Sequence, residues 1–490
     1  MPQLPIQFDN SYAKLPDIFY VKQLPQPVAA PHLIKLNEEL AALLGVDLDF
    51  LSTPDGLAML SGNQMPQGAS PLAMAYAGHQ FGHFVPQLGD GRANLLGEVI
   101  GCDGIRRDIQ LKGAGQTPFS RMGDGRAALG PILREYIVSE AMHTLGVPTT
   151  RALAAVTTGE QVARETFLPG AILTRVAQSH IRVGTFQYFA ARQDKEALKI
   201  LADHVIERHY PEAARAHEPY VDLITAVLTR QASLIAKWMS LGFIHGVMNT
   251  DNMSIAGETI DYGPCAFMDV YHPKTVFSSV DQMGRYAFGN QPGIAHWNLV
   301  QFAQCLLPLL DEVSDKAIAK AQEAINQFPV KFEAALGDEL RKKIGLAKPQ
   351  DNDLALAQDL LGLMAENEAD FTLTFSSLVR YVNSSDGENS HFKKPAAFEE
   401  WVVRWRTRLN EENISGPEMV DRLRAANPVI IPRNHLVEEA IRAAEDNQDF
   451  AVFEALTEAM SHPFDEKFED TNYALPPRAE QIVHRTFCGT

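Results

Sequence analysis

The sequence predicts an α+β protein with two lobes, a strand-rich lobe followed by a helical one. Short runs with strand-like alternation fall in the first part of the chain, and apolar residues at helical spacing dominate after about Phe186. This change of pattern along the chain predicts two lobes with a cleft between them, where ligands tend to bind. With 490 residues, 46% of them hydrophobic, the chain can bury a sizeable core.

The first lobe is predicted from four apolar runs separated by turn residues. In the second run Ile109 and Leu111 alternate with Gln110 and Lys112, so Lys112 should point away from the apolar face. The predicted strands cover 94–100, 106–112, 152–157 and 171–176, with a turn at 101–104 and loops at 25–31 and 61–71.

The helical part is predicted from apolar stripes of period 3.6, the clearest of which covers 221–241. A helix at 129–145, ended by Gly146 and Pro148, belongs to the first lobe. Further helices are predicted near 312–345, 353–365, 397–410 and 436–460, and the Pro-rich stretch from His462 is an ordered tail or a loop.

Charge and composition exclude several classes of function. A formal net charge of −18 argues against nucleic-acid and anionic-membrane partners, because both attract basic surfaces. The first 20 residues lack the pattern of a secretory signal, and the most apolar stretch, 299–310, is too short to cross a bilayer. We therefore expect a soluble, cytoplasmic protein. Four cysteines with no C-x-x-C pair predict neither a disulfide scaffold nor a zinc site.

Two features of the first lobe fit phosphate binding. Gly89-Asp90-Gly91-Arg92 directly precedes a strand, and glycines let backbone N–H groups approach phosphate oxygens, although an ordinary hairpin turn explains the motif as well. Lys112 ends the next strand, and Glu135 lies at the edge of the apolar stripe of the following helix. A strand lysine paired with a helix glutamate is the protein-kinase arrangement for holding phosphates; the alternative is two unrelated surface charges.

The segment after the long helix carries the most specific pattern. A kinase catalytic loop has His, one residue, Asp, four residues, Asn, a short hairpin and then Asp-Phe-Gly. His245, Asn252 and the run Asp261-Tyr262-Gly263 occupy the corresponding positions, with a turn at Gly257. Asn and Asp supply hard oxygen ligands that suit Mg²⁺ bound against phosphates. The spacing therefore predicts a kinase-type catalytic loop; a solvated loop with scattered polar residues is the alternative.

One residue departs from the kinase pattern. Val247 stands where a kinase has its base, and valine accepts no proton, so ordinary phosphoryl transfer by that route is in doubt. Asp251 is the nearest carboxylate that could orient or deprotonate a hydroxyl, unless it only caps a turn.

Over nearly its whole length the chain resembles the selenoprotein O family of protein adenylyltransferases, which are pseudokinases. The resemblance rests on long and specific motifs. These are 89–92 (Gly-Asp-Gly-Arg), 110–121 (Gln-Leu-Lys-Gly-Ala-Gly-Gln-Thr-Pro-Phe-Ser-Arg), 245–252 (His-Gly-Val-Met-Asn-Thr-Asp-Asn), 261–264 (Asp-Tyr-Gly-Pro) and 486–490 (Thr-Phe-Cys-Gly-Thr).

The resemblance implies a protein-kinase-like fold in which ATP binds in the reverse of the kinase orientation and AMP passes to Ser, Thr or Tyr hydroxyls of proteins. The protein itself is one candidate acceptor. It also implies an N-terminal extension and N-lobe over 1–190, a helical C-lobe over 191–420 and a C-terminal extension over 421–490. Asp251 would be the base, Lys112 would pair with Glu135, and Asn252 and Asp261 would bind Mg²⁺, with Mn²⁺ as an alternative. The implied nucleotide contacts are Gly89, Gly91, Arg92, Lys112, Asp124, Gly125, Arg175, Arg182 and Asp261.

The cysteines support a second hypothesis. Selenocysteine, in the family members that have it, stands at the place of Cys488, and Cys265 directly follows the 261–264 motif. A reversible Cys265–Cys488 disulfide would tie the tail across the active-site region; two independent reduced thiols are the alternative.

Two other functions remain open from the residues. A small-molecule phosphotransferase also uses a His-Gly-Asp loop, but Val247 argues against it. A non-catalytic or redox-sensing pseudokinase scaffold fits Val247, whereas Lys112, Glu135, Asn252 and Asp261 favour retained nucleotide chemistry.

Overall fold

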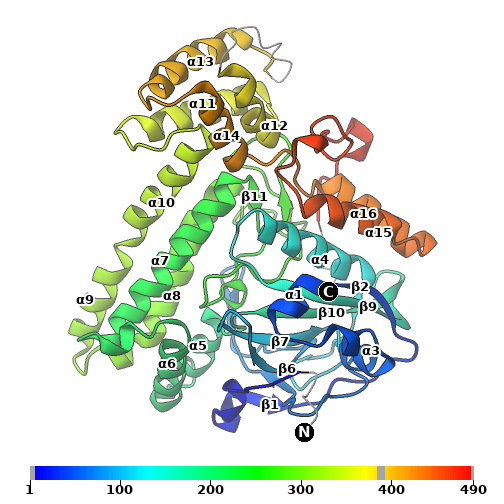
Figure 1. The fold of residues 1–490 in the computed structure, drawn as a ribbon. Helices are drawn as coiled ribbons and strands as arrows, with labels where there is room; N and C mark the ends of the chain where they lie inside the picture. Colours follow the sequence, from blue (N-terminus) through cyan, green and yellow to red (C-terminus); the bar gives the residue numbers. More distant parts are fainter. Residues whose placement is uncertain (1–5, 383–391, 487–490) are drawn as a thin grey trace.

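A computed structural model describes residues 6–382 and 392–486 and shows a large β-sheet flanked by helices, joined to an elongated helical part (Figure 1). The sheet is antiparallel throughout, in the order β1-β3-β6-β7-β10-β9-β2, with β8 pairing to β10. Its strands are β1 (Tyr20–Lys22), β2 (His32–Leu36), β3 (Leu72–Met74), β6 (Ala93–Ile100), β7 (Arg106–Lys112), β8 (Ala127–Ala128), β9 (Arg151–Ala163) and β10 (Phe167–Ala177). Two two-stranded sheets are separate from the large sheet. One is the hairpin of β4 (Gly78–Gln80) and β5 (His83–Val85), and the other pairs β11 (Phe243–Ile244) with β12 (Ala266–Phe267).

Alternating side chains bury the two faces of the large sheet against different helices. Ile109 and Leu111 of β7 pack with α1 (Glu38–Leu43), α2 (Leu48–Leu51) and α3 (Pro54–Leu60). The other face packs through Ala171 and Leu173 against α4 (Leu129–Thr144). Lys112 therefore points toward α4, the face opposite Ile109 and Leu111, as its alternation predicts.

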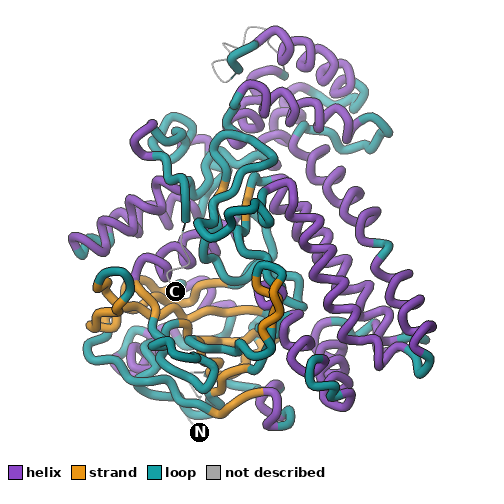
Figure 2. The backbone as a smooth tube through the Cα atoms, turned by 180° about the vertical axis from the view of Figure 1, so that it is seen from behind, coloured by secondary structure: helices purple, strands orange, loops and turns teal. Residues whose placement is uncertain are grey.

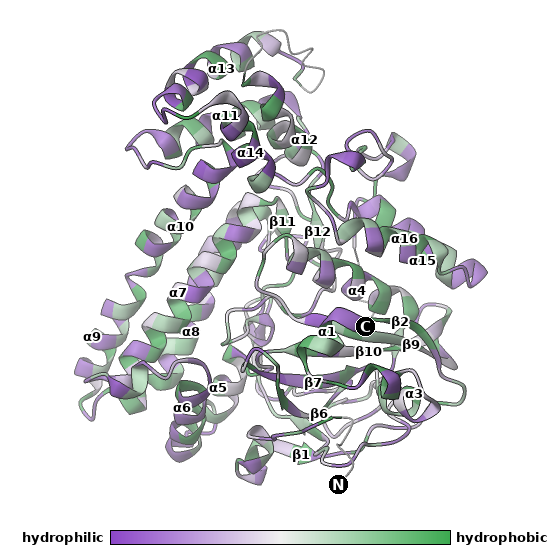
Figure 3. Cartoon of the chain, in the orientation of Figure 1, coloured by the Kyte–Doolittle hydropathy of each residue, from purple (hydrophilic) through white to green (hydrophobic). Residues whose placement is uncertain are grey.

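The second half of the chain is helical, and its long helices lie on one side of the molecule while the strands of the sheet gather on the other (Figure 2). Apolar residues recur along α7 and pack against α8, α9 and α10 (Figure 3). The helices are α5 (Val183–Ala190), α6 (Lys195–His209), α7 (Pro219–Ser240), α8 (Gln291–Leu310), α9 (Ser314–Ile325), α10 (Phe328–Lys343), α11 (Asp353–Asn367), α12 (Phe371–Ser376), α13 (Pro395–Asn410), α14 (Gly416–Ala426), α15 (Asn434–Asn447) and α16 (Ala451–Met460).

The last two helices return to the sheet side of the molecule. Apolar residues of α15 and α16 share one core cluster with α4, so they cover the outer face of that helix. Arg433, at the start of α15, is fully buried and binds Asp370 at 2.8 Å, and its guanidinium also contacts Asp269 and the Ala474 carbonyl. A buried guanidinium shared between two carboxylates fixes the C-terminal segment to the helical part.

Most predicted helices and strands are confirmed, but two stretches predicted as continuous helices are each divided in two. The strand at 106–112 and the helices at 129–145 and 221–241 match to within two residues, and β9 and β10 extend beyond their predicted bounds. The helical stretches at 312–345 and 436–460 each split into two helices, at Asn326 and at Gln448. Gln448 has a φ of +56°, which ends α15 in a left-handed cap.

The predicted hairpin between Asn252 and Asp261 is wrong. Gly257 does lie in a turn, where its N–H donates to the Ser254 carbonyl, but the two arms of the turn do not pair with each other. Ser254 pairs with Arg182 and Thr259 pairs with Thr149 instead. Each arm therefore bonds to a segment that leads into or out of the large sheet, which a local reading of the turn could not anticipate. Among the helices of the described residues, none is long and apolar enough to cross a membrane.

Candidate active site

A lysine from the sheet and a glutamate from the adjoining helix form the first ion pair of the site. Lys112 ends β7, and its Nζ binds the Glu135 carboxylate, which projects from the sheet-facing side of α4. Both side chains are buried, and Lys112 Nζ also lies 3.5 Å from Asp261 Oδ1. The alternative of two unrelated surface charges is excluded, because the pair is formed and buried.

Asp261 lies where three cations converge. Its Oδ1 accepts a hydrogen bond from Arg175 at 2.7 Å, and its Oδ2 accepts one from Arg182 at 3.1 Å. Opposite charges this close favour the carboxylate, and together with Lys112 they hold the pKa of Asp261 well below its usual range. Asp261 has a φ of +65°, a left-handed conformation that asparagine and aspartate adopt more readily than most residues.

The two arginines are held by buried neighbours, so they are not the surface residues that a basic stretch would give. Arg175 donates to Gln110 Oε1 at 2.6 Å and to Glu135 Oε1 at 3.3 Å. Arg182 lies over the Tyr76 ring, 4.5 Å from its centroid, and donates to the Asp251 carbonyl at 3.0 Å. Their guanidinium groups are buried and held in place, and guanidinium forks suit phosphate oxygens.

The candidate base, Asp251, is buried beneath the β4–β5 hairpin. Its Oδ2 accepts a hydrogen bond from Gln80 Nε2 at 3.3 Å, while its Oδ1 has no hydrogen-bond partner among the described residues. Burial raises the pKa of Asp251 to about 6. An unpartnered buried oxygen with a pKa close to neutral is the state expected of a group that takes up a proton.

The hairpin is fastened to the loop that carries Asp251. The His79 backbone N–H donates to Thr250 Oγ1 at 2.7 Å, and the Phe81 N–H donates to Asn249 Oδ1 at 3.0 Å. Thr250 in turn donates to Gln187 on α5 at 2.6 Å. Side chains of the loop thus accept hydrogen bonds from backbone N–H groups of the hairpin, and these bonds fix the position of the hairpin relative to the loop.

The remaining loop residues have structural partners. His245 is fully buried, stacks on Trp238 and donates through Nε2 to the Ile260 carbonyl at 2.8 Å, which ties the two ends of the loop together. Asn252 donates to the carbonyl of Val247 at 3.0 Å and is half-buried. Val247 itself is buried and aliphatic, so it offers no proton acceptor.

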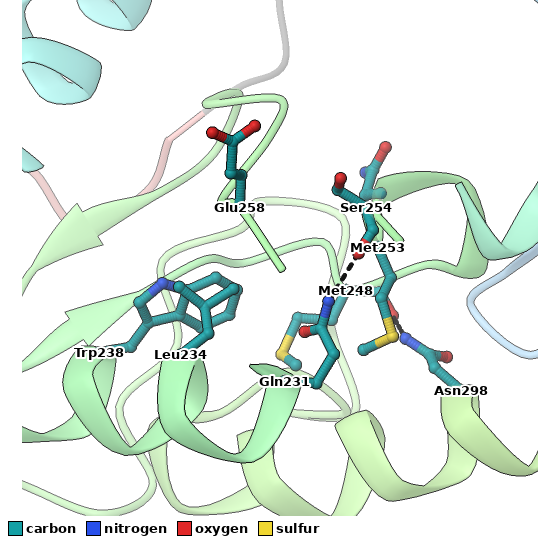
Figure 4. Close-up of a pocket in the computed structure, with 9 residues that line it drawn as sticks. Gln231, Leu234, Trp238, Met248, Met253, Ser254, Glu258 and Asn298 are labelled. Atoms are coloured by element: carbon teal, nitrogen blue, oxygen red, sulfur yellow. Dashed lines mark hydrogen bonds between the residues drawn. The ribbon is translucent and has the colours of Figure 1, made fainter. Parts of the chain in front are cut away.

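Asn252 also borders a small cavity of about 10 Å³, with room for about one water molecule (Figure 4). The cavity lies between α7 and the catalytic loop, and Ser254 and Gln231 face each other across it through a hydrogen bond of 2.7 Å. A cavity of this size cannot hold a nucleotide or another small-molecule ligand.

The 89–92 motif and a second Gly-Asp-Gly-Arg run at 123–126 lie in loops, and of these residues Asp90 lies nearest the charged cluster, 3.9 Å from Arg182. Gly89 has a φ of +77°, and the loop that follows it is held by Thr117, whose hydroxyl donates to the Asp90 carbonyl at 2.7 Å. Gly91 and Arg92 are half-buried at the start of β6. Asp124 forms an exposed ion pair with Arg164 at 2.8 Å, and the neighbouring Gly125 packs against Gly115 with no room for a Cβ atom. No contact in the described residues joins Asp124 or Gly125 to the cluster around Asp261.

Several residues of the site are not predicted from the sequence. Tyr76 and Asp90 line Arg182, and Gln80 donates to Asp251. Tyr76 and Gln80 belong to no recognisable motif, whereas Asp90 lies within the 89–92 motif, whose glycines and arginine are the predicted contacts. Gln110 is the exception, because its alternation with Ile109 and Leu111 places it on the same face as Lys112.

The two predicted metal ligands carry hard oxygen donors, and in this structure both oxygens of Asp261 are engaged by cationic side chains. Asn252 and Asp261 both offer oxygen atoms, and Mg²⁺ bound against phosphates needs only one or two protein carboxylates. Within 6–382 and 392–486 no three His, Cys, Asp or Glu side chains gather as a metal site by themselves. A cation here would therefore depend on ligands from a bound substrate.

Buried lysine and arginine side chains grouped with carboxylates are typical of enzymes that transfer phosphorus-containing groups, because fixed cations stabilise the charge on the phosphates. Comparison with known proteins gives the family: the sequence model described as "Protein adenylyltransferase SelO" matches residues 2–461. The chain belongs to this family.

Curated relatives match over nearly the whole chain. Proteins described as "Protein nucleotidyltransferase YdiU" are 59% identical in Bradyrhizobium diazoefficiens, 60% in Rhodopseudomonas palustris and 61% in Methylorubrum extorquens. Each match covers 99% of this chain and 99% of the relative.

Proposed function

We propose that this protein is an adenylyltransferase that moves AMP from ATP to Ser, Thr or Tyr hydroxyls of proteins and releases pyrophosphate. The observation that carries the proposal is the convergence of Lys112, Arg175 and Arg182 on Asp261, beside the buried Asp251. Membership of a family described as protein adenylyltransferases, and the similarity to proteins described as protein nucleotidyltransferases, support the same reaction.

The arrangement supports a protein-kinase-like fold with 1–190 as N-lobe and extension, 191–420 as helical C-lobe and 421–490 as C-terminal extension. The Lys112–Glu135 ion pair joins the sheet to α4, as a kinase N-lobe requires. Asp261 lies beside that pair, 3.5 Å from Lys112 Nζ, and the Asp251 backbone carbonyl accepts a hydrogen bond from Arg182.

Three cationic side chains give the site more fixed positive charge than a kinase lysine alone supplies. Arg175 and Arg182 are both buried, and each is held by at least one neutral hydrogen-bond partner in addition to Asp261. A polyphosphate entering the site would exchange contacts with Asp261 for contacts with its own oxygens. Such preorganised donors stabilise the charge that grows on the phosphates during transfer. We propose that Gly89, Gly91, Arg92, Asp124 and Gly125 provide the remaining nucleotide contacts.

In the proposed reaction the substrate hydroxyl oxygen bonds to the α-phosphorus, and the bond from that phosphorus to the bridging oxygen breaks. The pyrophosphate leaves with the bonding electrons, and Asp251 accepts the hydroxyl proton. Its Oδ1 is the acceptor, because Oδ2 is engaged by Gln80. Mg²⁺ or Mn²⁺, held by Asn252 and Asp261, would neutralise phosphate charge.

Val247 distinguishes this function from phosphoryl transfer of the kinase kind. The valine side chain is buried at the position of the kinase base. A small-molecule phosphotransferase would need a carboxylate there, whereas the buried carboxylate of this site is four positions further along the chain, at Asp251. The scaffold alternative would leave the buried cation cluster without a role.

We also keep the proposal of a regulatory disulfide between Cys265 and Cys488. Cys265 is buried directly after the 261–264 motif, while Cys488 lies outside the described residues. The last described residue of the tail, Thr486, donates its hydroxyl to the Pro264 carbonyl at 2.6 Å. The tail therefore reaches the residue next to Cys265.

The deciding experiment supplies Mg²⁺, a lysate or the protein itself as acceptor, and ATP labelled in turn on the α- and γ-phosphates. Protein-bound α label without γ label, lost in Asp261→Ala, is the expected result. Protein-bound γ label would show a kinase instead. An absence of metal-dependent label under reducing conditions would favour the scaffold.

A further inference from the structure

A groove lies along α7, beside the turn at 256–258 and the end of α10. It has a volume of about 660 Å³, within the range of roughly 300–1,000 Å³ that small-molecule sites occupy. Five separate parts of the chain form its walls: the segment at 146–148, Gln178, one stripe of α7, the turn at 256–258 and the last turns of α10. The lining residues are Gly146, Pro148, Gln178, Thr229, Arg230, Ser233, Leu234, Lys237, Ala256, Gly257, Glu258, Glu339 and Lys342.

The groove is positively charged although the whole chain carries a net charge of −18. Lys237 and Lys342 both bind Glu339, at 3.0 and 2.7 Å, so two cations share one carboxylate. Arg230 donates to the carbonyls of Ala256 and His209. In the described part of the chain its partners are thus carbonyls, together with the Tyr210 ring, and not carboxylates. With Glu258 protonated two positive charges remain uncompensated, and with Glu258 ionised one remains, so the groove attracts an anion in either state.

Glu258 forms the inner wall and adds a hydrogen-bonding group. It is 8% exposed and accepts one hydrogen bond, from the Gln178 backbone N–H at 2.8 Å. Figure 4 shows its carboxylate pointing away from Leu234 and Trp238. Burial raises the pKa of Glu258 to about 7, so near neutral pH the group is partly protonated and can donate to an oxygen of a ligand.

The walls of the groove continue into the segments that carry the candidate active site. Residues 146–148 follow α4, which bears Glu135, and Gln178 follows β10, which bears Arg175. Ala256 and Glu258 lie in the turn between Asn252 and Asp261. The groove is therefore connected through the chain to three of the segments that carry the candidate active site.

We propose that this groove binds a small anionic metabolite that carries a phosphate or carboxylate group and is no larger than a nucleotide. Arg230, Lys237 and Lys342 supply the positive charge, and Glu258 and the backbone of the 256–258 turn supply hydrogen bonds. The proposal is independent of the reaction at the active site, because it concerns binding alone.

The test measures binding of citrate and of inorganic phosphate to the full-length protein by calorimetry, each at matched ionic strength. Hydrogen–deuterium exchange then shows where each probe protects the backbone. Ser233 allows a matched series, because it is an exposed groove residue on α7 whose side chain only bonds to the Thr229 carbonyl. The variants are Ser233→Glu, Ser233→Lys and the neutral Ser233→Gln.

We expect protection at 229–237, 256–258 and 339–342. Ser233→Glu should weaken binding by at least about tenfold, Ser233→Lys should tighten it, and Ser233→Gln should stay within about twofold. Comparison of the two probes shows whether the groove prefers carboxylate or phosphate groups. The proposal would be overturned if the Glu and Lys variants bound the probes with equal affinity or if neither probe bound. Protection confined to Lys112 and Arg175 would overturn it as well.

Discussion

Gly78 and Asp251 are fitted to each other so closely that a Cβ atom at Gly78 would overlap Asp251 Oδ1 and stand 2.8 Å from Asp251 Cγ. Gly78 begins β4, so the absence of a side chain there leaves the space that the carboxylate occupies. The oxygen in question is the one without a hydrogen-bond partner in the described residues, the proposed proton acceptor. The hairpin thus sets the position of the base.

Gly78→Ala should lower the rate of AMP transfer by at least about tenfold, because the methyl group displaces the Asp251 carboxylate from its place. Backbone strain should contribute little, since Gly78 is not among the residues with positive φ. Turnover with α-labelled ATP and the thermal midpoint of each variant are the measurements.

Gly293→Ala is the matched control for the glycine substitution. Gly293 lies within α8, and an added Cβ would meet no atom within 4 Å. This variant should keep full activity and gain up to about 1 kcal/mol of stability from the better helix propensity of alanine. Equal activity of the two variants would contradict the fit between Gly78 and Asp251.

Asp251→Asn should lower turnover by about 10²–10⁴-fold, the usual contribution of a general base. The amide has nearly the same volume and can keep the hydrogen bond from Gln80, so the fold should persist. ATP affinity, measured by calorimetry, should change little. Among the described residues the Asp251 carboxylate forms no hydrogen bond or ion pair with Lys112, Arg175 or Arg182, and only its backbone carbonyl accepts a hydrogen bond from Arg182. Near-wild-type turnover of the purified variant would rule out the role of base.

Asp261→Ala should lower turnover by at least about 10²-fold, the scale of one preorganised electrostatic group. The substitution leaves Lys112, Arg175 and Arg182 facing one another without the carboxylate that they share. Asp203→Asn serves as the control, because Asp203 forms an exposed pair with Lys199 on α6. A rate loss of similar size in both variants would show a general effect on the preparation and not a role for Asp261.

The sequence predicts those parts of the site that follow from local periodicity. Strand alternation places Lys112 and Gln110 on one face, and the stripe of the following helix places Glu135 toward it, so this pair is predictable. Arg175 and Arg182 follow only from the resemblance to a family. Their burial depends on pairing between β10, β7 and the catalytic loop, which no single segment encodes.

Other parts depend on contacts between distant residues. Gln80 reaches Asp251 across 171 positions of the chain, from a strand of three residues that is too short to show alternation. The two arms of the Gly257 turn look like a hairpin locally, yet each finds a better partner elsewhere. The packing of α15 on α4 likewise becomes visible only in the folded molecule, because both helices have ordinary amphipathic patterns.

Replacing Glu258 by glutamine should remove a pH-dependent loss of stability. The pKa of this buried carboxyl rises from its ordinary 4.5 to about 7. Between these values the unfolded carboxyl is ionised while the folded one keeps its proton, so the free energy of unfolding falls as the pH rises through this window. Glu258→Gln should therefore be more stable than the wild type by roughly 1–3 kcal/mol at pH 8, with the difference vanishing near pH 4. Urea unfolding at several pH values measures this.

Glu412→Gln is the control with the opposite sign. Glu412 is buried and binds Arg408 at 3.2 Å and Arg422 at 3.1 Å, and the backbone N–H groups of Ala347 and Lys348 also donate to it. These donors lower the pKa of Glu412, so its stabilising effect is present above the ordinary pKa and is lost as the pH falls through the lowered value. Its replacement should destabilise the protein at pH 8 and matter less in acid. If both variants shifted the unfolding midpoint in the same direction at pH 8, the charge state assigned to Glu258 would be wrong.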